Sequence, residues 1–164
     1  MPRIVIDLQE NPGGNSGVIF PILQHIRTHG TLTAFGGRLS TSPASATLFR
    51  GRVFVLTSPS TFSSAVWVAD ALYANGLAVT VGQPTGLAPS AVGEIDPFVT
   101  GGSTIVGQVS TRYFHATGLQ ASAAALMPTI PAPLTVQEVQ AGINPVARWL
   151  QQLGGSGPTP SGGQ

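Results

Sequence analysis

Three short apolar runs recur along the chain, and helical periodicity follows the first two of them. The runs are residues 4–8 (IVIDL), 53–57 (VFVLT) and 77–81 (LAVTV). Short runs rich in Val, Ile and Leu, with few polar positions, are typical of strands buried on both faces of a parallel sheet. Strand and helix patterns in alternation therefore predict an α/β fold with a mostly parallel sheet.

Two helices are expected between these strands. After the turn sequence NPGG, Ser16 is the predicted cap of a helix that ends at Gly30, and Pro21 inside it predicts a kink or a late start. The apolar side of that helix would carry Val18, Ile19, Ile22, Leu23 and Ile26. A second helix is predicted over residues 62–75, with Gly76 as its stop.

The remainder of the chain gives weaker signals. A polar loop is expected over residues 36–46, and strand-like runs over residues 98–100, 103–109 and 111–114. Two short helices are predicted over residues 136–141 and 145–152, the second capped by Asn144 with Pro145 at its first position. The predicted domain covers residues 1–152, and the Gly/Ser/Pro-rich residues 153–164 are expected to be a disordered tail.

Composition excludes several classes of function. At 164 residues the chain has the length of one domain, and with 8% charged residues and a net charge of +1 it lacks the basic footprint of a nucleic-acid-binding protein. It has no apolar run near the roughly 20 residues of a membrane span and no visible signal peptide. It contains neither Cys nor Lys. His25 and His29 lie four residues apart without a third ligand, so no metal and no cofactor is expected.

Hydroxyl side chains crowd into the junction between the second strand and the second helix, residues 57–64 (TSPSTFSS). In parallel α/β sheets, functional groups gather at the carboxyl ends of the strands. The segments that reach this end are residues 11–14, 58–64 and 83–94. The hydroxyls of Ser60, Thr61 and Ser63 either cap the helix or include a nucleophile.

The same segments resemble the C-terminal processing (tail-specific) protease family of serine peptidases, which includes the tricorn core and the retinoid-binding-protein repeats. Residues 7–14 (DLQENPGG) are similar to the family pattern D-L-R-x-N-x-G-G, and residues 61–66 (TFSSAV) to S/T-F-S-S-A-E. Residues 82–94 (GQPTGLAPSAVGE) resemble G-E-P-T-G-G-K-P-N-x-x-G-E. Weaker echoes of P-D-I and G-x-D-P lie at residues 128–130 and 142–145.

The resemblance implies a ClpP/crotonase-like layered fold and a serine peptidase acting on peptide or protein substrates. It places the nucleophile at Ser63, with the oxyanion hole formed by the amide of Gly13 or Gly14 and that of Ser64. A helix N-terminus suits this chemistry because its unpaired N–H groups favour a developing negative charge. Family members carry further structure before the first strand, so the N-terminal part of the domain is expected to be missing. Periplasmic or extracellular location is suggested by the resemblance alone, and the oligomeric state is left open.

The general base departs from the family pattern. Its lysine follows the serine by 25 positions, where this chain has Ala88, and Gln9 and Val66 replace an Arg and an acidic residue of the motifs. A replacement histidine lies upstream in tricorn-like members. Within the chain, His115, Glu94 and Asp96 are the candidate acids or bases. We therefore expect weak or absent peptidase activity. The alternatives are a non-catalytic relative that binds a peptide or apolar ligand in the same cleft, and an inactive α/β fragment.

Overall fold

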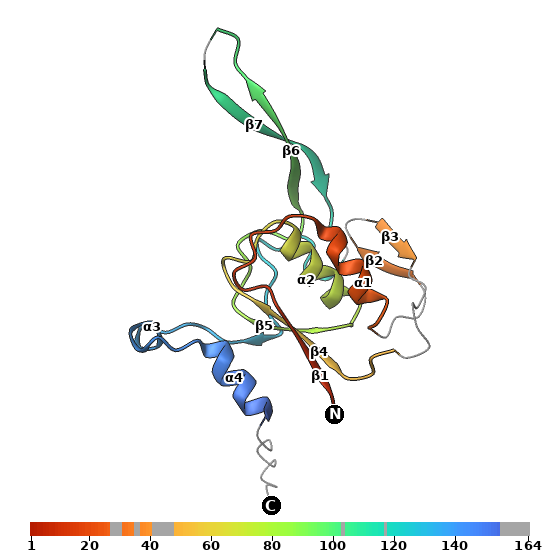
Figure 1. The fold of residues 1–164 in the computed structure, drawn as a ribbon, viewed down its shortest axis with the longest axis vertical. Helices are drawn as coiled ribbons and strands as arrows, with labels where there is room; N and C mark the ends of the chain where they lie inside the picture. Colours follow the sequence, from red (N-terminus) through yellow and green to blue (C-terminus); the bar gives the residue numbers. More distant parts are fainter. Residues whose placement is uncertain (27–30, 35–36, 41–47, 103, 117, 155–164) are drawn as a thin grey trace, which may run out of the picture.

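A parallel four-stranded sheet forms the centre of the computed structural model, which describes residues 1–26, 31–34, 37–40, 48–102, 104–116 and 118–154 (Figure 1). Its strands are β1 (Arg3–Asp7), β4 (Arg52–Thr57), β5 (Val79–Gly82) and β8 (Ile130–Pro131), in the order β1-β4-β5-β8. All three pairings are parallel. The three predicted strands and the α/β class with a mostly parallel sheet are confirmed. The two-residue β8 was not predicted.

Helices pack on both faces of this sheet and give the fold its layers. Along β4, Val53 and Val55 belong to one buried cluster with α2 (Ser64–Ala74), whereas Phe54 and Leu56 belong to a second cluster. The second cluster also contains Val146 of α4 (Pro145–Gly154). Alternate residues of β4 thus enter different cores, which explains why residues 53–56 (VFVL) are all apolar. β1 lies at the edge and is less buried than expected, with Val5 41% exposed.

The first helical region is shorter than predicted. It consists of a 3₁₀ turn, η1 (Ser16–Val18), and a single short helix, α1 (Ile19–Leu23). The cap is Asn15 rather than Ser16, because the Asn15 side chain accepts a hydrogen bond from the Gly17 amide. The predicted stop at Gly30 lies outside the described residues. Residues 36–46, expected as a loop, contribute β3 (Gly37–Ser40), which pairs antiparallel with β2 (Thr31–Ala34).

A long antiparallel hairpin projects from the layered body (Figure 1). Its strands are β6 (Ala91–Val99) and β7 (Val106–Phe114), so the separate short strands expected here are continuous. At its base, the Phe114 ring stacks on Trp67 of α2 with centroids 3.9 Å apart. Apolar side chains along it are largely exposed: Val92, Ile95, Phe98, Val99, Ile105, Val106, Val109 and Tyr113. The stacked rings of Phe114 and Trp67 therefore hold one end of the hairpin against α2.

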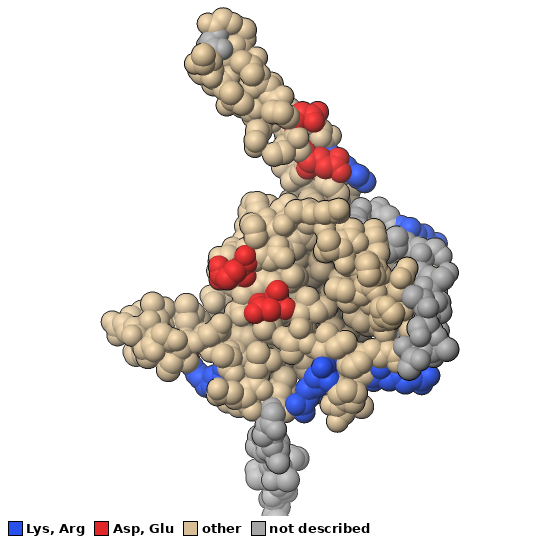
Figure 2. Space-filling view, viewed as in Figure 1, with Lys and Arg blue, Asp and Glu red and all other residues tan. Residues whose placement is uncertain are grey.

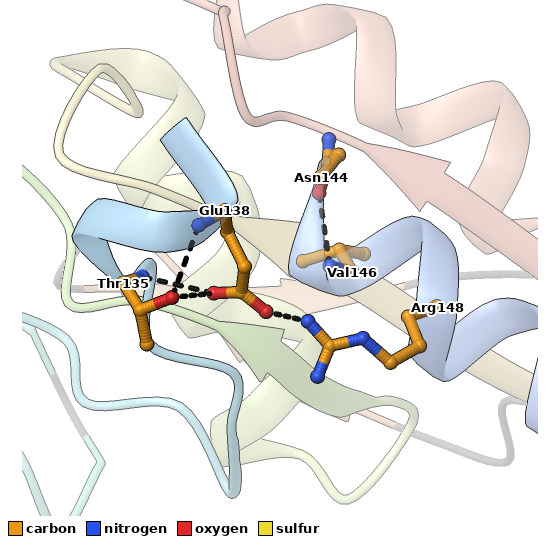
Figure 3. Close-up of polar contacts among 5 residues, drawn as sticks. All are labelled: Thr135, Glu138, Asn144, Val146 and Arg148. Atoms are coloured by element: carbon orange, nitrogen blue, oxygen red, sulfur yellow. Dashed lines mark hydrogen bonds and ion pairs between the residues drawn. The ribbon is translucent and has the colours of Figure 1, made fainter. Parts of the chain in front are cut away.

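The C-terminal helices are joined by a polar network (Figure 3). Thr135 caps α3 (Val136–Ala141) through a capping box with Glu138, as both reciprocal hydrogen bonds are present. The other carboxylate oxygen of Glu138 pairs with Arg148 of α4. The Asn144 side chain accepts from the Val146 amide at 2.9 Å, so Asn144 is the predicted cap of the last helix. Both predicted helices are confirmed, the second extending to Gly154.

Charged side chains are sparse on the face shown in Figure 2, where uncharged residues cover most of the surface. The longest helix in the described part of the chain, α2, has 11 residues. None of the described helices has the length and apolar character that crossing a bilayer requires.

Candidate active site

The loops that follow β1 and β4 meet at the carboxyl end of the sheet. The Phe62 amide donates to the carbonyl of Asn11 at 3.0 Å, which joins the two loops directly. A Cβ placed on Gly13 would lie 2.6 Å from the Ser63 Cβ and 2.9 Å from the Ser64 nitrogen. The predicted neighbours Gly13, Ser63 and Ser64 are therefore in contact, on one side of the sheet.

Ser63 has a strained backbone at the head of α2. Its φ of 50° and ψ of −129° lie outside the regions that L-residues ordinarily occupy. Although Ser63 is the N-cap residue, its side chain makes no capping hydrogen bond. The half-buried hydroxyl has no hydrogen-bond partner among the described residues. A serine held in an unfavourable conformation without a capping bond fits a role beyond helix capping.

The neighbouring hydroxyls hold the strand-to-helix turn in place. Thr61 donates to the carbonyl of Leu8 at 2.7 Å and accepts from the Ser58 amide at 2.9 Å. Ser58 donates to the carbonyl of Gln9, and Thr57 donates to that of Gln83 at 2.8 Å. These bonds tie the turn after β4 to the segments after β1 and β5. The hydroxyl cluster thus fixes the position of Ser63 and is not a set of helix caps.

Of the two turn glycines, only Gly14 has an amide without a hydrogen-bond acceptor among the described residues. The Gly13 amide already donates to the Asn11 side-chain oxygen at 2.9 Å. The amides of Gly14 and Ser64 have no acceptor among the described residues, and the Ser64 hydroxyl donates to the carbonyl of Gly14. Ser64 begins α2, where backbone N–H groups lack intrahelical acceptors. Two amides that remain available beside a serine could stabilise an oxyanion.

Two cavities adjoin this serine turn, and Ser64 lines both. One, of about 260 Å³, is mostly apolar and includes Gly13 and Ala65 in its lining. The other, of about 320 Å³, is lined by Gly14, Trp67, Glu94 and Arg112 among others. Glu94 and Arg112 form an exposed ion pair at 3.3 Å. The turn therefore separates an apolar cavity from one with charged groups.

Ala88 lies on a loop that is hydrogen-bonded to the segment that contains Ser63. The Gly86 amide, two positions before Ala88, donates to the carbonyl of Thr61 at 3.0 Å. The Trp67 indole donates to the carbonyl of Pro89, the residue after Ala88, at 3.1 Å. Both bonds hold the loop against residues 61–67. Ala88 itself lines neither cavity beside Ser64.

The candidate acids and bases are distributed unevenly. Glu94 reaches the charged cavity with a φ of 49°. Asp96 is exposed farther along β6, and exposed His115 follows β7 and packs on Tyr113 with ring centroids 4.6 Å apart. Neither lines a cavity beside Ser64. The structure therefore brings Glu94 towards the serine turn and leaves His115 outside the two cavities.

Asp70, on α2, has a carboxyl group with a raised pKa. It is buried on α2, where desolvation raises its pKa to about 6. Its Oδ1 has no hydrogen-bond partner in the described part of the chain. A buried carboxyl without a partner favours its neutral form.

Sequence reasoning included Asn11 in a candidate segment without giving it a role, and it did not single out Arg112. The side-chain oxygen of Asn11 accepts a hydrogen bond from the Gly13 amide. An Asn two residues before a Gly is a known turn signal that indicates such a bond. Tertiary packing places Arg112 in the lining of the charged cavity, with its guanidinium 4.7 Å from the centre of the Phe114 ring. No local pattern links Arg112 to a site 49 residues earlier.

Comparisons with known proteins bear on the family and the fold of the chain. A model of peptidase family S41 matches residues 1–131. No curated protein matches the sequence. Among solved structures, a candidate peptidase from Parabacteroides merdae has a TM-score of 0.69 at 14% identity over 92% of this chain. The photosystem II D1 C-terminal processing protease has a TM-score of 0.55 at 19% identity over 84% of this chain.

The tricorn protease shares the fold as well, with a TM-score of 0.57 at 19% identity over 92% of this chain. At such identities the likeness concerns the fold alone. The chain spans 51%, 37% and 15% of the Parabacteroides merdae, D1-processing and tricorn proteins, respectively. Most or about half of each of those proteins thus lies outside the matched region.

Proposed function

The chain belongs to peptidase family S41, and from that premise we propose that it carries the nucleophile side of a serine peptidase site, with Ser63 attacking a peptide carbonyl. The observation that carries this proposal is the conformation of Ser63. Its β-carbon packs against Gly13 at a strained helix head, and its hydroxyl makes no capping bond. A cap residue would gain stability from that bond, whereas a nucleophile must keep its oxygen available.

The proposed reaction is acyl transfer. The Ser63 Oγ adds to the peptide carbonyl carbon while its proton passes to a base, and the amides of Gly14 and Ser64 hold the resulting oxyanion. Collapse expels the amine, which takes up a proton, and water then hydrolyses the acyl-enzyme to release the acid. The Gly13 amide already donates to the Asn11 side chain. The proposed role of Gly13 is therefore to let the backbone approach Ser63 closely, because a glycine has no β-carbon.

The mechanism requires a general base, and the lysine that serves as the base in the family is absent. The sequence has no lysine, and the family position is Ala88. Without base assistance, which contributes about 10²–10⁴-fold, turnover by this chain alone is expected to be very slow. Glu94 is the candidate nearest to the serine turn, since it lines a cavity with Ser64 and Gly14. One of its carboxylate oxygens lies 3.3 Å from the Arg112 guanidinium, which fixes the position of the side chain at this cavity.

A non-catalytic relative is the second candidate, favoured by the replacement of the lysine by Ala88 and by the apolar cavity at Ser64. In that case the cleft binds a peptide or apolar ligand without cleaving it. Periplasmic or extracellular location belongs to the proposal too, supported by the family resemblance.

Labelling by a fluorophosphonate probe separates the two candidates. We expect slow, stoichiometric labelling that Ser63→Ala abolishes and that the matched variant Ser60→Ala leaves unchanged, because Ser60 is exposed three positions earlier. A fluorogenic peptide assay on the same variants measures turnover. Labelling that survives Ser63→Ala would contradict the nucleophile assignment. Robust turnover lost in His115→Ala would make His115 the base.

A further inference from the structure

The mostly apolar cavity beside Ser64, of about 260 Å³, is assembled from β1 and the loop after it and from η1, α1 and α2. Leu8 follows β1, Val18 and Ile22 come from η1 and α1, and Ala65 and Val68 come from α2. Small-molecule sites usually measure about 300–1,000 Å³, so this cavity is sized for a part of a ligand, such as one side chain.

Three polar side-chain atoms in the lining of this cavity are already hydrogen-bonded within the protein. The side-chain oxygens of Asn11 and Asn15 accept the amides of Gly13 and Gly17 at 2.9 and 2.8 Å. The Ser64 hydroxyl donates to the carbonyl of Gly14. Among the lining residues that the structure describes there is no Asp, Glu, Lys, Arg or His. A charged group entering the cavity would lose water without gaining an ionic partner.

Two apolar side chains at the rim of the cavity are open to solvent. Val18 is 66% exposed and Ile22 37% exposed, and both line the cavity. On the far side of the serine turn, by contrast, the second cavity holds the Glu94–Arg112 ion pair. The two sides of Ser64 therefore offer opposite environments to the parts of a bound peptide.

We propose that this cavity is a specificity pocket that takes an uncharged, apolar side chain of leucine or methionine size from the peptide residue next to the scissile carbonyl. This inference rests on the proposed function for the position of that carbonyl. The evidence for it is that the cavity adjoins the serine turn: Gly13 and Ser64 line the cavity, and both are neighbours of Ser63. A carbonyl held at the amides of Gly14 and Ser64 leaves its neighbouring side chain at the cavity mouth.

Binding of peptides that are not cleaved tests the pocket. The probes are acetyl-Ala-Ala-X-amide peptides with Leu, Ala, Asp or Lys at X, titrated calorimetrically or by NMR into the 164-residue chain and its Ser63→Ala variant. Each buried CH₂ adds about fourfold in affinity. The leucine peptide should therefore bind about tenfold or more tightly than the alanine peptide, and the aspartate and lysine peptides most weakly.

Two variants locate the binding. Val18→Asp places a carboxylate at the exposed rim and should weaken the leucine peptide about tenfold. Its matched control is Val136→Asp, which changes an equally apolar side chain, 70% exposed on α3, and should leave binding unchanged. Ala65→Leu fills the cavity from α2 and should also remove the preference. If Ala65→Leu fails to fold, the Val18→Asp and Val136→Asp comparison still decides.

Several outcomes would overturn the inference: no measurable binding of the leucine peptide, equal binding of the aspartate or lysine peptide, or equal effects of Val18→Asp and Val136→Asp. The failure of the proposed function looks different. Fluorophosphonate labelling would be absent or independent of Ser63, while the preference for leucine would persist in both the parent chain and Ser63→Ala.

Discussion

Gly13 and Ser63 are packed so closely that a β-carbon on the glycine would lie 2.6 Å from the Cβ of the serine, although 50 positions separate them. A real Cβ cannot sit at that distance, so any other residue at position 13 would move the serine turn. The φ of 104° at Gly13 is a second reason for glycine, since side chains rarely adopt it. The contact joins the two segments that the site needs.

Gly13→Ala should lower the free energy of unfolding by about 3 kcal/mol, from the unfavourable φ and the clash together. Gly14→Ala is the matched control, because its φ of 128° is also unfavourable but no atom lies within 4 Å of the added Cβ. Urea denaturation of both variants isolates the clash. Equal losses of stability would show that Gly13 and Ser63 do not meet.

Ser63→Gly and Ser63→Ala test the strain at the helix head. Glycine tolerates the φ of 50° and ψ of −129° that alanine does not, so Ser63→Gly should be more stable than Ser63→Ala by about 1 kcal/mol or more. At Ser64, in the first turn of α2, the same pair should reverse order because alanine is the better helix former. Thermal or urea unfolding measures all four. A more stable Ser63→Ala would argue against the strained conformation.

Asp70 should make the protein less stable as the pH rises. Burial raises its pKa from 3.8 to about 6, so between these values the folded state binds more protons than the unfolded state. The free energy of unfolding therefore falls from about pH 4 to about pH 6 and stays lower above, by about 2–3 kcal/mol. Asp70→Asn should remove this fall.

Urea midpoints from pH 4 to pH 8 measure the effect, and Asp96→Asn is the control, because Asp96 is exposed on β6. An unchanged pH profile in Asp70→Asn, or the same change in Asp96→Asn, would contradict the assignment to a buried carboxyl.

The strands of the sheet were predictable because burial on both faces leaves an unmistakable run, as in VFVLT of β4. The hairpin of β6 and β7 was only partly predictable, since Gly93, Glu94 and Pro97 interrupt the strand signal. The structure explains Gly93: a Cβ there would lie 2.7 Å from Trp67 and 3.0 Å from Phe114. That requirement is tertiary and leaves no local pattern.

The candidate site divides in the same way. The contact of the serine turn with the glycine turn follows from parallel strand order and the motif resemblance, both visible in the sequence. The engagement of the Gly13 amide by Asn11 and the approach of Glu94 with Arg112 depend on loop and hairpin geometry. The first helix was overestimated because Ile26 continues the apolar period, although α1 ends at Leu23.

Ala88→Lys should raise the reactivity of Ser63. The loop carrying Ala88 is bonded to Thr61 and, through Pro89, to Trp67, so a lysine there extends from a position fixed against the head of α2. A lysine near the positive end of the α2 dipole would have a lowered pKa, because the dipole disfavours the charged form, so more of the neutral amine would be available as a base. Base assistance of this kind contributes up to about 10²–10⁴-fold.

The measurement is the rate of fluorophosphonate labelling against pH for Ala88→Lys and for Ala88→Met, which has similar length and no amine. We expect faster labelling only in Ala88→Lys, rising with pH as the amine deprotonates, and its complete loss in the double variant with Ser63→Ala. Equal rates in the lysine and methionine variants would mean that position 88 does not reach Ser63 in this chain. An increase that survives Ser63→Ala would place the reactive group elsewhere, since the new amine or another serine would then be the labelled atom.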